Sequence, residues 1–215
     1  MSSGFVQGQI AGLIGGTIGG ITGGINAKSH GGNFWTGKGA KYNMLSSSAG
    51  NSITIGEGME YSNEYATDFS DKYFGKDVRG VDNLYADGSL PPKYRSKGDI
   101  VFAPNGDKVS GTAIYNGVGK GTDVYLYKAA FVCKEELYLV MGHEYMHAYF
   151  NSFGKFNDAS DWQHKVINVW QTKQAVMWNY KTEIYLPLNE KINALPNLNE
   201  YSSRIPFSIM GYRPW

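Results

Sequence analysis

Residues Leu137–Gly154 read LYLVMGHEYMHAYFNSFG, and Glu144 is the only charged side chain among them. A segment that is apolar nearly all round predicts a buried central helix. A single carboxylate is costly to bury in such a helix without a partner. In a helix, His143 and His147 stand four residues apart on one face. A divalent metal between the two imidazoles would account for all three polar side chains, so we interpret the segment as a zinc site.

The chemistry of such a site gives each of the three residues a role. Neutral imidazoles of His143 and His147 bind Zn²⁺, which keeps one position open for water and lowers the pKa of that water towards neutrality. Glu144 takes the proton of the water as a general base and returns it to the leaving amine. The sequence therefore predicts a hydrolase with Glu144 as its catalytic residue.

A zinc site of this kind needs a third protein ligand. The preferred candidate is His164, which lies 17 residues after His147 and near the start of the next predicted helix. Asp158 and Asp161 are alternatives, although an Asp in or before a first helical turn is also explained by capping or by the helix dipole. Glu183, farther along the chain, is the remaining alternative. The preferred metal ligands are His143, His147 and His164.

Other side chains are also candidates for a role in the same reaction. A donor for the oxyanion is sought among Tyr180, Tyr185 and Tyr212, because a polarised carbonyl needs a partner opposite the metal. Cys133 stands ten residues before His143, which is roughly 15 Å along a helix. That distance is too long for proton transfer between the two side chains, so we interpret Cys133 as a packed thiol.

The composition limits the class of protein. The chain has 215 residues, enough for one domain with an appendage. Charged residues make up 18%, the formal net charge is +1, and no Lys/Arg block is present. This argues against a nucleic-acid partner held by phosphate contacts. With Cys133 as the only cysteine, no internal disulfide and no Cys-based zinc ribbon can form, so metal ligands must come from His, Asp and Glu.

The N-terminal segment differs from the rest, because its first 27 residues carry no charge and glycine recurs at every fourth position from Gly8 to Gly24. A file of small residues lets apolar helices approach closely, in a membrane or in a glycine zipper. Each Gly nevertheless costs about 1 kcal/mol of helix propensity relative to Ala. We interpret residues 1–58 as a Gly-rich linker or docking segment, with membrane contact through residues 4–25 as the alternative. Residues 59–215 then form the functional domain.

The remaining patterns predict an α+β fold, with a small antiparallel sheet ahead of the active-site helix and a second packing helix that closes the site. Ser160 and Gln163 match a capping box at the start of that second helix. The strand at Thr122–Val132 is expected to bind an extended substrate by edge pairing. The predicted helices are Glu60–Phe74, Lys134–Phe153 and Ser160–Lys181, the predicted strands Ile100–Ala103, Lys108–Tyr115 and Thr122–Val132, and the turn-rich stretches Gly75–Gly98 and the chain after Pro187.

The segment HEYMHAY, followed by His164 at the start of the next helix, resembles the zincin metallopeptidases, and its spacing resembles their SprT/spartan-like branch. The resemblance covers Leu137–Trp170, and the zinc ribbon of SprT-type proteins is absent. It implies a zincin-like fold, a bound Zn²⁺ and a protein or peptide substrate.

A second resemblance lies in the N-terminal third. The stretch GLIGGTIGGITGGINAKSHGGNFWTGKGA, residues 12–40, resembles the Gly-rich segment that follows the Rhs core in bacterial polymorphic toxins. The resemblance implies a toxin domain that is secreted or injected by a bacterium, acts in a target cell and is neutralised by a cognate immunity protein.

Taken together, the patterns and resemblances predict a zinc-dependent metallopeptidase that serves as the toxin domain of an Rhs-type effector. Two other classes stay open. One is a membrane-active toxin that inserts its Gly-rich segment and holds a structural zinc. The other is a non-catalytic binding module with a vestigial motif. An amidase or another hydrolase on the same scaffold also stays open, because the motif fixes the water and not the substrate.

Overall fold

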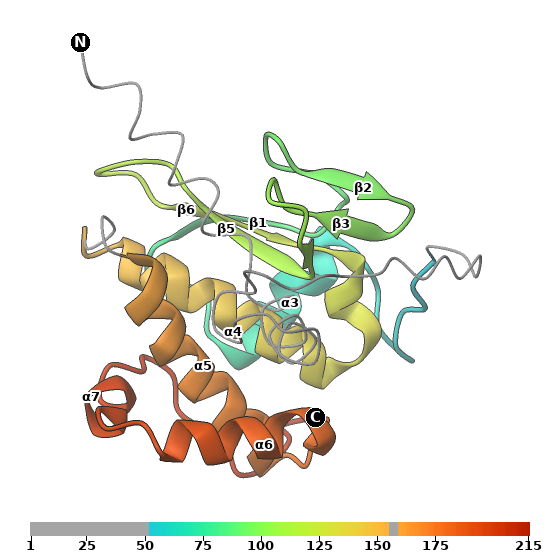
Figure 1. Ribbon diagram of the computed structural model, residues 1–215. Helices are drawn as coiled ribbons and strands as arrows, with labels where there is room; N and C mark the ends of the chain where they lie inside the picture. The colour runs from blue at the N-terminus through green and yellow to red at the C-terminus, as the bar shows by residue number, and fades with distance from the viewer. Residues whose placement is uncertain (1–51, 155–158) are drawn as a thin grey trace.

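The structure is a computed structural model that describes residues 52–154 and 159–215, with side chains of the second range described from Trp162 onwards. The predicted α+β class is confirmed: the described part holds five α-helices, one 3₁₀ helix and two three-stranded sheets (Figure 1). The α-helices are α3 (Asn63–Tyr73), α4 (Lys134–Asn151), α5 (Ala159–Met177), α6 (Thr182–Asn193) and α7 (Leu198–Ser202). The strands are β1 (Val81–Tyr85), β2 (Arg95–Lys97), β3 (Ile100–Phe102), β4 (Lys108–Val109), β5 (Gly111–Tyr115) and β6 (Thr122–Leu126), and the 3₁₀ helix is η1 (Lys128–Val132).

Helix α4 is the buried central helix that the sequence predicts, and nearly all of its side chains are shielded from solvent. It begins after Cys133, whose Sγ accepts a hydrogen bond from the backbone N–H of Glu136. Glu135 and Glu136 in the first turn complement the helix dipole. The helix packs against β5 and β6 on one side and against α5 on another. Figure 1 shows it running beneath the sheet.

The first sheet has the strand order β1-β6-β5, with β6 parallel to β1 and antiparallel to β5. Three predictions about this region are wrong. The sheet that packs on α4 is mixed and not antiparallel, because β1 and β6 run parallel. The predicted strand Thr122–Val132 ends at Leu126 and continues as η1. Because β6 is the central strand with neighbours on both sides, it has no open edge for an extended substrate. The edge strand beside α4 is β5 instead.

The second sheet has the order β2-β3-β4 and is antiparallel throughout. It encloses a small core of its own, formed by Tyr94, Val101, Ala103, Val109 and Tyr127. The stretch Gly75–Gly98, predicted to consist of turns, contains both β1 and β2. Their sequences, VDNLY and RSK, lack the apolar alternation that marks a strand, and all three residues of β2 are exposed.

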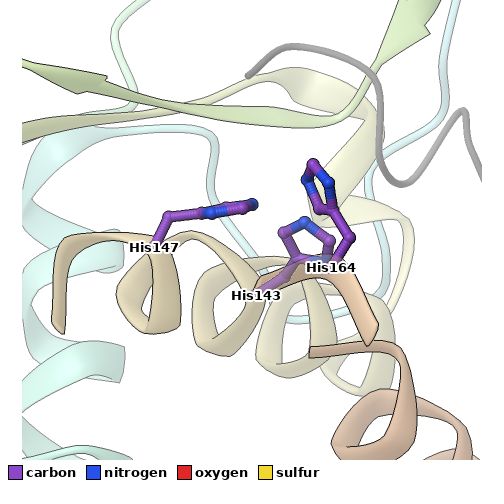
Figure 2. A group of neighbouring side chains, drawn as sticks. All are labelled: His143, His147 and His164. Carbon is purple, nitrogen blue, oxygen red and sulfur yellow. The ribbon is translucent and has the colours of Figure 1, made fainter. Parts of the chain in front are cut away.

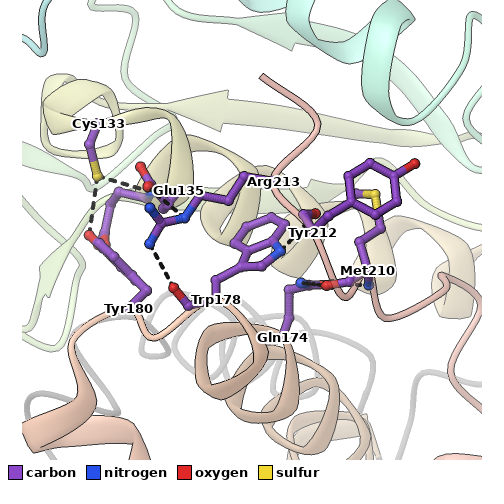
Figure 3. A network of polar contacts seen from close by, with 9 residues as sticks. Cys133, Glu135, Gln174, Trp178, Tyr180, Met210, Tyr212 and Arg213 are labelled. Atoms are coloured by element: carbon purple, nitrogen blue, oxygen red, sulfur yellow. Dashed lines mark hydrogen bonds and ion pairs between the residues drawn. The ribbon is translucent and has the colours of Figure 1, made fainter.

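The prediction that the chain becomes turn-rich after Pro187 is also wrong, because Pro187 lies inside α6. Proline lacks a backbone N–H and disfavours a helix interior. Tyr185, Leu188 and Ile192 are buried, and the packing of α6 against α5 keeps the segment helical. Farther along, Gln174 of α5 exchanges two hydrogen bonds of 2.8 Å with the backbone of Met210, which fastens the C-terminal segment to this helix (Figure 3).

The first described residues already contact the folded body. The backbone N–H of Ile53 donates to Asp99 at 2.7 Å, and that of Gly56 donates to the carbonyl of Phe131 at 2.8 Å. The predicted domain boundary between residues 58 and 59 stays a prediction, since most of the Gly-rich segment, including residues 4–25, lies outside the described residues. Within the described part of the chain, no helix is long and apolar enough to cross a membrane.

Candidate metal centre

The HExxH segment, His143–His147, occupies a little more than one turn of α4, as the sequence predicts. The side chains of His143, Glu144 and His147 are 0%, 2% and 3% exposed. The four-residue spacing brings the two imidazoles to one face of the helix, with ring centroids 5.0 Å apart. Burial of three polar side chains at one place is costly unless each finds a partner there.

The third imidazole comes from a different helix. His164 near the start of α5 places its ring centroid 4.8 Å from that of His147 and 6.2 Å from that of His143. One nitrogen of each ring lies within 4.8 Å of the others, which forms a group that could hold a metal ion. Figure 2 shows the two α4 rings and the α5 ring gathered at one point. The three histidines chosen from the sequence therefore lie close enough together to hold a metal ion, while their role as zinc ligands stays a prediction.

Size and chemistry of the group fit a divalent ion. Nitrogens bound to zinc at about 2.0–2.1 Å in tetrahedral geometry lie roughly 3.4 Å apart. The three nitrogens of the group lie within 4.8 Å of one another, so the rings would have to move closer together to bind one ion. Nε2 of His147 and Oε2 of Glu144 are buried and have no hydrogen-bond partner among the described residues. Such unpaired buried atoms indicate a missing partner.

Two glutamines of α5 contact the histidines of α4. Nδ1 of His143 lies 3.1 Å from Oε1 of Gln171, and Nδ1 of His147 lies 3.1 Å from Oε1 of Gln163. With Nδ1 engaged, Nε2 is the nitrogen that could coordinate a metal in both rings. The sequence does not predict either contact: it places Gln163 in a capping box with Ser160, whose side chain lies outside the described residues, whereas the structure brings Oε1 of Gln163 to His147. The sequence predicts that both glutamines lie on the second helix, but it does not predict which side of that helix packs against α4.

Burial sets the protonation of the histidines. Removal from solvent, reinforced by the proximity of His164, lowers the pKa of His143 to about 3. The same causes hold the pKa of His147 well below its usual range. Both imidazoles are therefore neutral at physiological pH, and the neutral form is the one that binds a metal.

Glu144 lies between its helix and the edge strand β5. Its carboxyl group accepts a hydrogen bond from the backbone N–H of Ala113, and burial raises its pKa well above the usual value. A divalent cation on the imidazoles would lower that pKa again, since an opposite charge favours the ionised form. Gly111 leaves the room for this carboxyl group, because a Cβ there would lie 3.1 Å from Cγ and 3.2 Å from Oε1 of Glu144.

The alternative ligands fall in two groups. Asp158 and the side chain of Asp161 lie outside the described residues, so their candidacy stays open. Glu183 is exposed in the first turn of α6 and does not belong to the histidine group.

The three tyrosines considered as oxyanion donors lie at different places. The hydroxyl of Tyr180 donates to Glu136 at 2.7 Å and accepts from Cys133 (Figure 3). Tyr212 is 71% exposed. Tyr185 is buried, and its hydroxyl hydrogen-bonds the side chain of Gln171. Of the three, only Tyr185 is linked to a histidine of the group, and the link runs through Gln171.

Comparison of the chain with known protein families, with curated proteins and with solved structures finds no match.

Proposed function

We propose that the chain is a zinc-dependent metallopeptidase with a zincin-like site. The observation that carries the proposal is the convergence of His143, His147 and His164 from two helices, with Glu144 buried beside the first of them. Three imidazoles match the ligand number and type of a catalytic zinc site, which keeps one position for water or substrate. A structural zinc site has four protein ligands as a rule.

Bound zinc would supply a Lewis acid that polarises a carbonyl group and makes a water molecule acidic near neutral pH. The protein supplies the base. One oxygen of Glu144 is held by the N–H of Ala113, while Oε2 has no hydrogen-bond partner in the described part of the chain. Such a carboxylate is oriented, and still has an oxygen available to take a proton from water and pass it to the leaving nitrogen.

The edge of β5 is the surface that we propose for the peptide substrate. The hydrogen bonds from Tyr127 N–H to the Ser110 carbonyl and from Asn116 N–H to the Gly121 carbonyl place Ser110 and Asn116 opposite β6. Because backbone direction alternates along a strand, the backbone of Ala113 faces away from β6. Ala113 is buried and its N–H is already bonded to Glu144, so an extended peptide that pairs with this edge would have to displace that contact, which would bring the peptide beside Glu144.

The role as a toxin domain rests on the Gly-rich segment of residues 12–40. We propose an Rhs-type effector that is secreted or injected by a bacterium and neutralised by a cognate immunity protein. Expression in a bacterial cell that lacks the immunity protein should arrest growth, and Glu144→Gln should relieve the arrest. A membrane-active toxin predicts instead that Glu144→Gln still kills and still releases dye from liposomes.

Metal content and peptide cleavage test the enzymatic proposal together. Mass spectrometry should find one zinc per chain in wild type, in Asp161→Ala and in Glu183→Ala, and much less in His164→Ala. Glu144→Gln should retain zinc and cleave a peptide library at least about 100-fold more slowly, since general-base catalysis contributes that much or more. Wild-type protein without zinc, or Glu144→Gln with full activity, contradicts the proposal.

A further inference from the structure

The two buried glutamines of α5 determine more than local packing. The oxygen of a side-chain amide can only accept a hydrogen bond, so the histidine nitrogen that faces it has to carry the proton. Gln171 faces Nδ1 of His143 and Gln163 faces Nδ1 of His147, both at 3.1 Å. Each contact therefore selects the Nδ1–H tautomer, and Nε2 of that ring has the lone pair that a metal needs.

We propose that Gln163 and Gln171 are positioning residues that set the tautomer and the ring orientation of the two α4 ligands, an inference that rests on the metal site proposed above. His164 is on the same helix, next to Gln163. Helix α5 thus supplies one ligand directly and supports the other two, so its packing against α4 assembles the complete site.

The two glutamines differ in the hydrogen bonds that hold their own side-chain amides. The side chain of Gln171 also hydrogen-bonds the hydroxyl of Tyr185 in α6, which restrains the amide. Nε2 of Gln163 is buried without a hydrogen-bond partner among the described residues. The position of His143 is therefore linked to α6 through Gln171, whereas in the described part of the chain the amide of Gln163 makes no corresponding bond to another helix.

A matched control lies one turn farther along the same helix. Gln174 is as buried as the other two glutamines, but it bonds the backbone of Met210 and neither of the α4 histidines. Gln174→Met therefore removes a buried amide and its hydrogen bonds without touching either α4 ligand. It reports the effect of destabilisation alone.

The first readout is the histidine tautomer in the metal-free full-length chain, measured by long-range ¹⁵N–¹H NMR. Wild type should show the Nδ1–H form at His143 and His147. Gln171→Met should shift His143 alone towards a mixture, and Gln163→Met should do so for His147 alone. Gln174→Met should shift neither. The Nε2–H form at both rings in wild type overturns the inference.

The second readout is zinc affinity, from competition with a chelator. Gln163→Met and Gln171→Met should each bind zinc about 10–100-fold more weakly, the usual effect of losing such a partner. Gln163→Glu and Gln171→Glu should keep wild-type affinity or exceed it, because a carboxylate also accepts from Nδ1–H. Tyr185→Phe should weaken binding less than Gln171→Met does. Gln174→Met should match wild type.

The outcomes separate this inference from the function on which it rests. Wild-type protein that binds no zinc overturns the metal site itself. Wild-type protein that binds zinc, with Met variants that bind equally well or no worse than Gln174→Met, overturns only the positioning role. If the Met variants do not fold, the Glu variants and Tyr185→Phe decide the same question: a Glu variant with at least 10-fold weaker zinc binding contradicts the inference.

Discussion

Gly142 of α4 lies directly against the indole ring of Trp170 in α5, with no room for a Cβ between them. This contact lies one residue before His143, where the two helices that carry the three histidines approach each other. The side chain of Trp170 is fully buried. The absence of a side chain at Gly142 thus allows α5 to come close enough for His164, Gln163 and Gln171 to reach the histidines of α4.

The first prediction concerns this contact. Gly142→Ala should destabilise the protein by about 1–3 kcal/mol, since an added methyl group in a packed core forces neighbours to move. The gain in helix propensity from Gly to Ala, about 1 kcal/mol, offsets only part of the loss. Urea unfolding of the metal-free chain measures the difference. Combination with Trp170→Phe should recover part of it, and an equal or higher stability of Gly142→Ala would contradict the prediction.

The second prediction concerns the room beside Glu144, the proposed general base. Gly111→Ala should lower peptide hydrolysis at least about tenfold while zinc content stays unchanged, because the new Cβ would lie 2.8 Å from Cγ1 of Val140 and 3.2 Å from Oε1 of Glu144, and both side chains would have to shift. The matched control is Gly56→Ala, where a Cβ would lie 2.7 Å from the carbonyl oxygen of Val132, outside the histidine group. That variant should lose stability but keep its rate per folded molecule. Equal rates for Gly111→Ala and wild type would show that this contact does not position Glu144.

The third prediction concerns metal removal. Treatment with a chelator should lower the melting temperature, and added zinc should restore it, because a ligand that binds only the folded state stabilises it by about 2.7 kcal/mol at 100 times its Kd. Differential scanning calorimetry with and without zinc measures the shift. His147→Ala should remove the response, since it deletes one ligand. An unchanged melting temperature of the wild-type protein after addition of zinc would argue against the metal site.

The fourth prediction concerns the thiol of Cys133. Burial raises its pKa, and the nearby carboxylates of Glu135 and Glu136 act in the same direction. At any pH from 7 to 9 the folded protein should therefore contain less thiolate than the urea-denatured chain, and iodoacetamide should modify it more slowly. Mass spectrometry of timed samples gives both rates. Cys133→Ala should keep full hydrolytic activity, and a loss of activity would assign the thiol a role beyond packing.

Strand prediction failed where pairing partners decide the structure. β1 carries Asp82 and Asn83, residues that are depleted in strands, yet it pairs with β6, with an irregularity between Val81 and Asn83. The predicted strand Thr122–Val132 was right up to Leu126, where the chain turns into η1. The prediction that this strand is an edge was wrong, because β1 pairs with it on the other side. The paired residues Val81 and Thr122 are 41 positions apart in the sequence. No local pattern contains that information.

The candidate metal centre also divides into features that local sequence determines and features that long-range packing determines. The helical period of α4, its burial and the common face of His143 and His147 follow from residues at most four positions apart, so the sequence by itself determined them. His164 could be chosen by residue type and spacing. Only the tertiary structure decided three other features. They are the contacts of Gln163 and Gln171 with the imidazoles, the contact of Glu144 with β5, and the continuation of α6 through Pro187. Each depends on which surfaces of distant elements face one another, and long-range packing sets that arrangement.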